Sequence, residues 1–86
     1  MKSKIDIKDK DKLNQELLKK ERVLREKIRL LKQDNLSFRK RLSTLNYEND
    51  KEEIERLNNM INNNLEYIKS LEARANNFKN MQKRNG

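Results

Sequence analysis

The sequence contains no cysteine, no histidine and no proline, and its single glycine is the last residue, Gly86. Without cysteine and histidine, disulfide bridges and the usual zinc ligands are excluded. Without proline or internal glycine, the residues that most often mark turns and hairpins are missing as well. Together these absences favour long, uninterrupted helices over a loop-rich globular fold.

Long hydrophobic runs are also missing, because no more than two apolar residues stand together anywhere in the chain. Such runs are too short for a membrane span or a signal-peptide core. We therefore predict an intracellular protein, with the cytoplasm as the favoured compartment. The basic triplet Arg39-Lys40-Arg41 resembles a nuclear import signal and leaves the nucleus as an alternative.

The composition is dominated by charge, since 42% of the 86 residues are charged and only 33% are apolar. A chain this short needs a dense apolar core to fold as a globule, and this composition does not supply one. Such a balance is typical of disordered chains or of helices that are stabilised by association. The spacing of the apolar residues distinguishes the two.

Apolar residues recur every seven positions in the first half of the chain, in the pattern of a leucine-zipper-like coiled coil. An asparagine at an a position can pair with its copy across two parallel helices, so Asn35 predicts a parallel, in-register homodimer. The alternative is that asparagine is abundant and falls on the seam by chance. The association seam of this half consists of Leu17, Leu24, Ile28, Leu31, Asn35, Phe38, Leu42 and Leu45.

A second heptad series follows in a different frame, so no continuous heptad joins the two halves across residues 46–53. Either one helix continues with a local change of winding, or the chain turns back into an antiparallel hairpin. The absence of glycine and proline favours the continuous helix. The second seam consists of Ile54, Leu57, Ile61, Ile68, Leu71, Ala75 and Phe78.

The predicted fold is therefore all-α: a long, mostly continuous helix that forms a coiled coil. We expect a frayed lead-in over 1–10, a helix over 11–83 and a frayed end over 84–86. Its heptad segments, 11–45 and 54–83, meet at 46–53, where Asp50 and Glu53 have the spacing of a helix-capping pair. A helix of about 70 residues would be roughly 105 Å long.

The apolar surface is broader in the second half, where Met60, Leu65 and Tyr67 stand beside the seam at g and e positions. A broader stripe buries more surface than a two-stranded seam does. These three residues are candidates for docking a further helix. The alternative is that they only flank a dimer core.

Positive charge is concentrated in residues 19–41, which carry ten Lys or Arg against three acids, a net charge of +7. This excess predicts attraction to anionic partners, including nucleic acid and acidic protein surfaces. The contact-residue signature of basic-zipper proteins is missing, so any nucleic-acid contact would be to phosphate. The candidate polyanion-binding residues are Lys19, Lys20, Arg22, Arg25, Lys27, Arg29, Lys32, Arg39, Lys40 and Arg41.

Catalysis is not expected, because a rod of this kind offers no pocket that could hold an acid, a base or a nucleophile in a fixed geometry. The sequence predicts no catalytic, metal-binding or cofactor-binding residue. We predict a non-enzymatic structural or adaptor protein that oligomerises and acts through protein-protein association. Its partners would be a second copy of the chain or another helical or acidic protein, and nucleic-acid or polyanion binding through 19–41 is the alternative.

Overall fold

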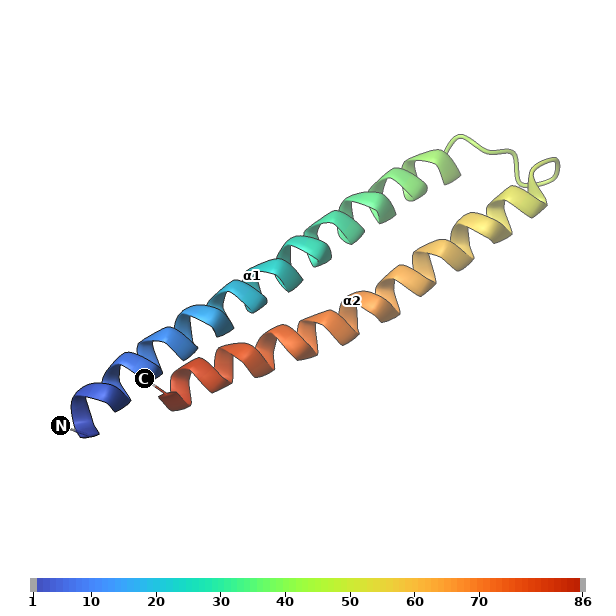
Figure 1. Ribbon diagram of the computed structural model, residues 1–86. Coiled ribbons are helices and arrows are strands. Elements are labelled where there is room, and N and C mark those ends of the chain that lie inside the picture. Colours follow the sequence, from blue (N-terminus) through green and yellow to red (C-terminus); the bar gives the residue numbers. More distant parts are fainter. Residues whose placement is uncertain (1, 86) are drawn as a thin grey trace.

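Two long helices make up the fold. The computed structural model describes the backbone of residues 2–85 and the side chains of residues 10–84. Helix α1 spans Lys2–Leu42 and helix α2 spans Lys51–Asn85, joined by a loop over 43–50. The helices lie side by side and antiparallel, so both ends of the chain are at the same end of the rod (Figure 1).

The predicted continuous helix is therefore wrong, and the alternative, an antiparallel hairpin, is the fold. The hairpin is 73 Å long and 15 by 13 Å in cross-section, instead of the roughly 105 Å expected for a single rod. Helix α1 begins at Lys2, earlier than the expected start near Asp11. The predicted frayed ends include Met1 and Gly86, which lie outside the described residues.

The loop is built by polar side chains in place of glycine and proline. At the end of α1, the hydroxyls of Ser43 and Thr44 donate to the carbonyls of Lys40 and Arg41, at 2.6 and 2.7 Å. Hydroxyl bonds of this kind offer the backbone carbonyls of a last turn an alternative partner. They help to end α1 without a glycine.

The reversal itself depends on Asn46 and Asp50. The Asn46 side-chain oxygen accepts from the amides of Glu48 and Asn49 at 2.8 and 3.2 Å, and the Asp50 carboxylate accepts from the Asn46 amide at 2.8 Å. No non-glycine residue in the described chain has a positive φ. Since the turn needs no left-handed conformation, it needs no glycine, and the absence of glycine was no argument for a continuous helix.

The predicted capping pair has other partners in the structure. Asp50 precedes the first residue of α2, but its carboxylate bonds within the loop, to Asn46. Glu53 instead forms ion pairs with Arg56, at 2.7 Å, and with Arg41 of α1, at 3.1 Å. The Arg41 pair joins the positively charged last turn of α1 to the acidic first turn of α2, where each charge also complements the helix dipole.

The predicted heptad positions are the ones that become buried. In α1, every described side chain outside the a and d positions is exposed, whereas those at a and d from Asn14 to Leu42 are buried or half-buried. In α2 the same holds, except that Glu53 and Met60 at g are also half-buried. Both seams therefore face each other within one chain. Leu45 is half-buried in the loop, and so extends the first seam past the end of α1.

Candidate association surfaces

The apolar residues of the two seams pack against one another between α1 and α2. Leu24 and Ile28 of α1 form one buried cluster with Ile68, Leu71 and Ala75 of α2, and Leu31 and Phe78 pack at its edge. Leu57 and Leu71 are the most buried large side chains, at 2% and 1% exposure. The seam of each helix is thus occupied by the other helix of the same chain.

A buried asparagine pair interrupts the apolar seam. Asn35 is only 5% exposed, and its side-chain amide donates to the carbonyl of Ile61 at 3.3 Å. Its side-chain oxygen accepts from the amide of Asn64 at 3.0 Å. The partner of Asn35 is therefore an asparagine of α2 in the same chain, whereas the sequence indicated the Asn35 of a second copy. The pair aligns the helices, because sliding either one would leave a buried amide without a partner.

A second polar contact crosses the seam near the ends of the chain. Glu21, 9% exposed, accepts from the side chain of Gln82 at 2.9 Å and from Arg25 at 2.8 Å. Asn64 and Gln82 were missed as seam residues, because only apolar side chains were counted in the second half. Their spacing was the available signal: Asn64 lies seven residues after Leu57, and Gln82 seven after Ala75.

The bond from Arg25 lowers the pKa of the Glu21 carboxyl below its usual value, and the bond from Gln82 lowers it further, while burial opposes the change. Ion pairs with Arg29 and Arg56 similarly lower the pKa of Glu26 and Glu53. All three carboxyls are therefore held in the charged form, which strengthens their bonds to arginine.

Met60, Leu65 and Tyr67 do not form a single docking face. Leu65 and Tyr67 are two residues apart, so a helix turns them about 200° away from each other. Leu65 lines a small groove of about 310 Å³ with Lys32, Leu36 and Arg39. Met60 and Tyr67 lie at g positions, on the other side of the seam.

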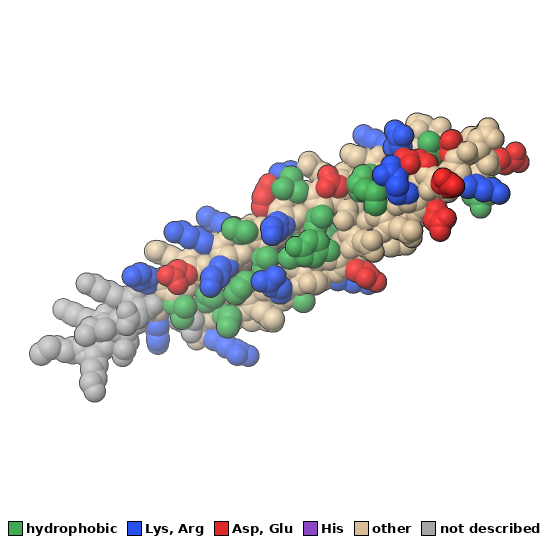
Figure 2. Space-filling model, turned by 45° about the vertical axis from the view of Figure 1, so that its right-hand side comes forward, with side chains coloured by type: hydrophobic (Ala, Val, Ile, Leu, Met, Phe, Trp, Pro, Cys, Tyr) green, Lys and Arg blue, Asp and Glu red, His purple; other side chains and the backbone are tan. Residues whose placement is uncertain are grey.

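One side of the seam carries the residues at heptad positions g and c, and we call it the apolar flank. It includes Val23 and Leu30 of α1, which are at c, and Met60 and Tyr67 of α2, which are at g. Val23, Leu30 and Tyr67 are 59%, 47% and 48% exposed. On the face drawn in Figure 2, hydrophobic side chains gather near the middle of the rod. Several of the exposed large apolar side chains thus lie beside a seam that is already filled.

All ten basic residues of 19–41 are exposed. Within the described side chains, three of them form ion pairs: Arg25 with Glu21, Arg29 with Glu26, and Arg41 with Glu53. The other seven have no ion pair among the described residues, and they are Lys19, Lys20, Arg22, Lys27, Lys32, Arg39 and Lys40.

Folding into a hairpin separates the charge along the rod. We define the open half as residues 10–32 with 65–84, and the turn half as residues 33–64. The open half carries fourteen Lys or Arg against six acids, and the turn half five against six. Figure 2 shows acidic and basic side chains mixed near the turn. The positive field therefore belongs to the open half.

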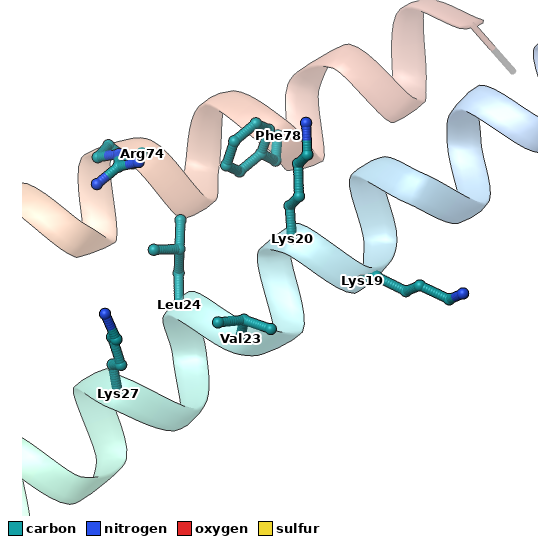
Figure 3. Close-up of a pocket in the computed structure, with 7 residues that line it drawn as sticks. All are labelled: Lys19, Lys20, Val23, Leu24, Lys27, Arg74 and Phe78. Atoms are coloured by element: carbon teal, nitrogen blue, oxygen red, sulfur yellow. The ribbon is translucent and has the colours of Figure 1, made fainter.

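A groove of about 490 Å³ lies in the open half between α1 and α2. We call it the basic groove; its lining residues are Lys19, Lys20, Val23, Leu24, Lys27, Arg74 and Phe78. In Figure 3, Lys20, Leu24 and Lys27 point from α1 toward α2, while Lys19 points away. The ammonium of Lys20 lies 6.0 Å from the centre of the Phe78 ring, at the outer limit of a cation-π contact.

The part of the chain that the structure describes holds neither a candidate metal site nor a membrane-spanning helix. No group of three or more acidic residues is placed so that it could hold a metal ion. Neither described helix is long and apolar enough to cross a membrane.

The chain matches no protein-family model, and comparisons with curated proteins and with solved structures find no match either. Its function therefore has to be inferred from its own surfaces.

Proposed function

We propose that this chain is a non-enzymatic adaptor or scaffold protein, a helical hairpin that acts by binding another protein along its apolar flank. The observation that supports this proposal is the exposure of Val23, Leu30 and Tyr67 beside a seam that is already filled. Large apolar side chains grouped on one face often mark a site of association. A third helix laid along this flank would cover them.

The hairpin suits such a role because it is held in one register before any partner binds. The Asn35–Asn64 and Glu21–Gln82 bonds fix how α1 and α2 align. A surface that is already ordered loses little conformational freedom on binding. The flank would therefore present its apolar side chains at fixed spacing.

Site-specific photo-crosslinking in the cells that make the protein tests this function. A photoreactive amino acid is placed at Val23 or Tyr67 and, as a control, at Ala73, which is exposed at an f position of α2 and faces away from α1. We expect protein adducts of defined mass from Val23 and Tyr67 and none from Ala73. Equal adducts from all three positions, or none, would overturn the proposal.

The predicted parallel homodimer stays within this proposal as one form of association. The seams are occupied within the chain, so pairing two chains through them would require the hairpin to open. Two closed hairpins could instead meet along their apolar flanks. A crosslinked adduct with twice the mass of the chain would identify this form.

Polyanion binding is the second candidate, supported by the seven basic residues of 19–41 that have no ion pair among the described side chains. It predicts that affinity for duplex DNA falls steeply with salt, by orders of magnitude between about 50 and 200 mM. Reversing Lys19 and Lys20 in the open half should weaken binding more than reversing Arg39, Lys40 and Arg41 in the turn half. Binding that is insensitive to salt or to these reversals would exclude this function.

A further inference from the structure

We propose that the basic groove binds an acidic amphipathic helix of a partner protein. This inference rests on the proposed function, because it names the partner of the open half of the apolar flank. Three features of the groove fit such a helix: its apolar floor, its positive rim and its direction along the rod.

The floor of the groove is apolar and stays partly exposed among the described residues. Leu24 is buried in the seam, Phe78 is half-buried at its edge, and Val23 is 59% exposed beside them. Both helices already pack against each other here. The Lys20 ammonium lies 6.0 Å from the centre of the Phe78 ring, and side chains from another molecule would cover Val23 beside it.

The rim of the groove is entirely positive. Lys20 and Lys27 of α1 and Arg74 of α2 line it together with Lys19, and none of the four has an ion pair among the described residues. The nearby acid Glu21 is engaged by Arg25 and Gln82. Like charges around one groove repel one another, so carboxylates from a partner would relieve this repulsion and bind the basic side chains.

The groove continues along the same flank toward the ends of the chain. One heptad from Lys20 and Arg74, Leu13 and Met81 line a further groove of about 260 Å³ with Leu17 and Arg84. The stretch from Leu13 to Lys27 is roughly 21 Å long at helical rise. An extended, straight site of this kind fits one face of a helix of about 14 residues, which presents apolar side chains at i, i+3, i+4 and i+7.

A nucleic acid fits the groove less well than a helix does. Phosphates would satisfy the rim, but a duplex has nothing apolar to place over Val23 and Leu13. The ring of Phe78 packs against the core cluster, and the Lys20 ammonium lies 6.0 Å from its centre, so the ring is a poor platform on which to stack a base. An acidic helix with an apolar stripe satisfies both the rim and the floor.

A second copy of the chain is also a poorer occupant. Its open half is basic, and its turn half carries five basic residues against six acids, so neither half offers a strongly acidic face. Homodimers through this groove would bring little negative charge to Lys20, Lys27 and Arg74. The partner is therefore expected to be a different protein.

Binding of designed peptides to the full chain tests this inference. The probe is a 21-residue amphipathic helix with leucine at heptad a and d positions and glutamate beside them, labelled with a fluorophore. One control peptide replaces each glutamate with lysine, and another scrambles the sequence. We expect saturable binding of the acidic helix at near-physiological salt, followed by fluorescence anisotropy, and none of either control.

Variants of the chain localise the site. The double substitution Lys20→Glu and Lys27→Glu should weaken binding of the acidic helix by about tenfold or more, because like charges across an interface repel. The matched control, Arg22→Glu with Lys40→Glu, makes the same change in charge outside the groove and should alter affinity by no more than about twofold. Circular dichroism of each variant checks that the hairpin is retained.

Three outcomes would overturn the inference: no binding of the acidic helix, equal losses in the groove and control variants, or tighter binding of a 20-base-pair duplex that the groove variant also abolishes. The proposed function is tested separately, by the protein crosslinks from Tyr67. If these crosslinks form although the groove does not bind the acidic helix, the proposed function stands and the partner binds elsewhere on the apolar flank. If they do not form either, both proposals are overturned.

Discussion

The open half and the turn half of the hairpin share one mode of packing and differ in surface charge. Each half has a nearly fully buried leucine on α2, Leu71 in the open half and Leu57 in the turn half. Each half also has a polar contact across the seam, Glu21–Gln82 and Asn35–Asn64. Their charges differ, at fourteen basic residues against six acids in the open half and five against six in the turn half.

This difference indicates that the seam and the charges serve separate purposes. If the positive charges stabilised the hairpin, acids would be expected to face them, as Glu53 faces Arg41 near the turn. In the open half, Lys20 and Arg74 line the same groove without an acid. The seam therefore accounts for the fold, and the basic groove is available for a partner.

The largest expected effects come from truncating the two buried leucines. Leu57→Ala and Leu71→Ala should each lower the free energy of unfolding by about 2–5 kcal/mol, because both leave a cavity in the seam. Since the two are buried equally, the costs should be similar in the two halves. Urea unfolding followed by circular dichroism measures them. Exposed Leu30→Ala and Leu36→Ala are the controls, and a similar loss in these variants would contradict the assigned seam.

The next effect concerns the asparagine pair of the turn half. Asn35→Ala should cost about 1–3 kcal/mol, because it removes a buried bond and leaves the amide of Asn64 without its partner. Replacing Asn35 and Asn64 together by leucine should restore or raise stability, since the seam becomes continuously apolar. Thermal unfolding of Asn35→Leu, Asn64→Leu and the double leucine variant completes a double-mutant cycle. Additive losses would show that the two asparagines do not interact.

Acid should weaken the hairpin through the carboxyls whose pKa is lowered. A carboxyl with a lowered pKa in the folded chain stabilises it fully above the usual value, 4.5, and this stabilisation is lost as pH falls through the folded pKa. Unfolding free energies measured from pH 6 to pH 3 should therefore fall at the acid end. Glu21→Gln should reduce this loss of unfolding free energy at low pH more than Glu53→Gln does, because Glu21 is more buried. A larger reduction in Glu53→Gln would contradict the buried contact between Glu21 and Gln82.

The smallest effect comes from the repulsion in the open half. Arg74→Glu introduces an acid on the rim of the basic groove, which Lys20 and Lys27 also line, and should raise stability by only about 0.5 kcal/mol, because exposed charges interact weakly. The same change should weaken binding of an acidic helix in the basic groove. A variant that becomes less stable and binds more tightly would contradict the separation between packing and surface charge. Thermal melts at low and high salt measure the first effect.

The heptad pattern predicted which residues of each helix are buried but not what covers them. Leu24 and Ile28 are buried as expected, yet they face Ile68 and Leu71 of the same chain. An apolar stripe at a and d positions can pack against a helix of a second chain or, equally well, against a second helix of the same chain. The displacement between the two heptad frames did locate the turn, since 46–53 overlaps the loop over 43–50.

The hairpin itself could not be read from the composition. Its turn is built from Ser43, Thr44, Asn46 and Asp50 without a positive φ, so the two residue types that usually mark a reversal were not needed. The basic groove could not be predicted either. Lys20 and Arg74 are far apart in sequence, and only the antiparallel alignment brings them to one flank.

The central claim is that the two seams fill each other within one chain, and an intrachain distance tests it most directly. Arg22 and Asn76 are exposed on the side away from the basic groove, and the natural chain has no cysteine, so Arg22→Cys with Asn76→Cys accepts two spin labels cleanly. The doubly labelled chain is diluted into an excess of unlabelled chain, and the distance is measured by pulsed electron paramagnetic resonance. The hairpin predicts roughly 20 Å, the width of two packed helices. A distance of roughly 80 Å, as along one continuous helix, would contradict it.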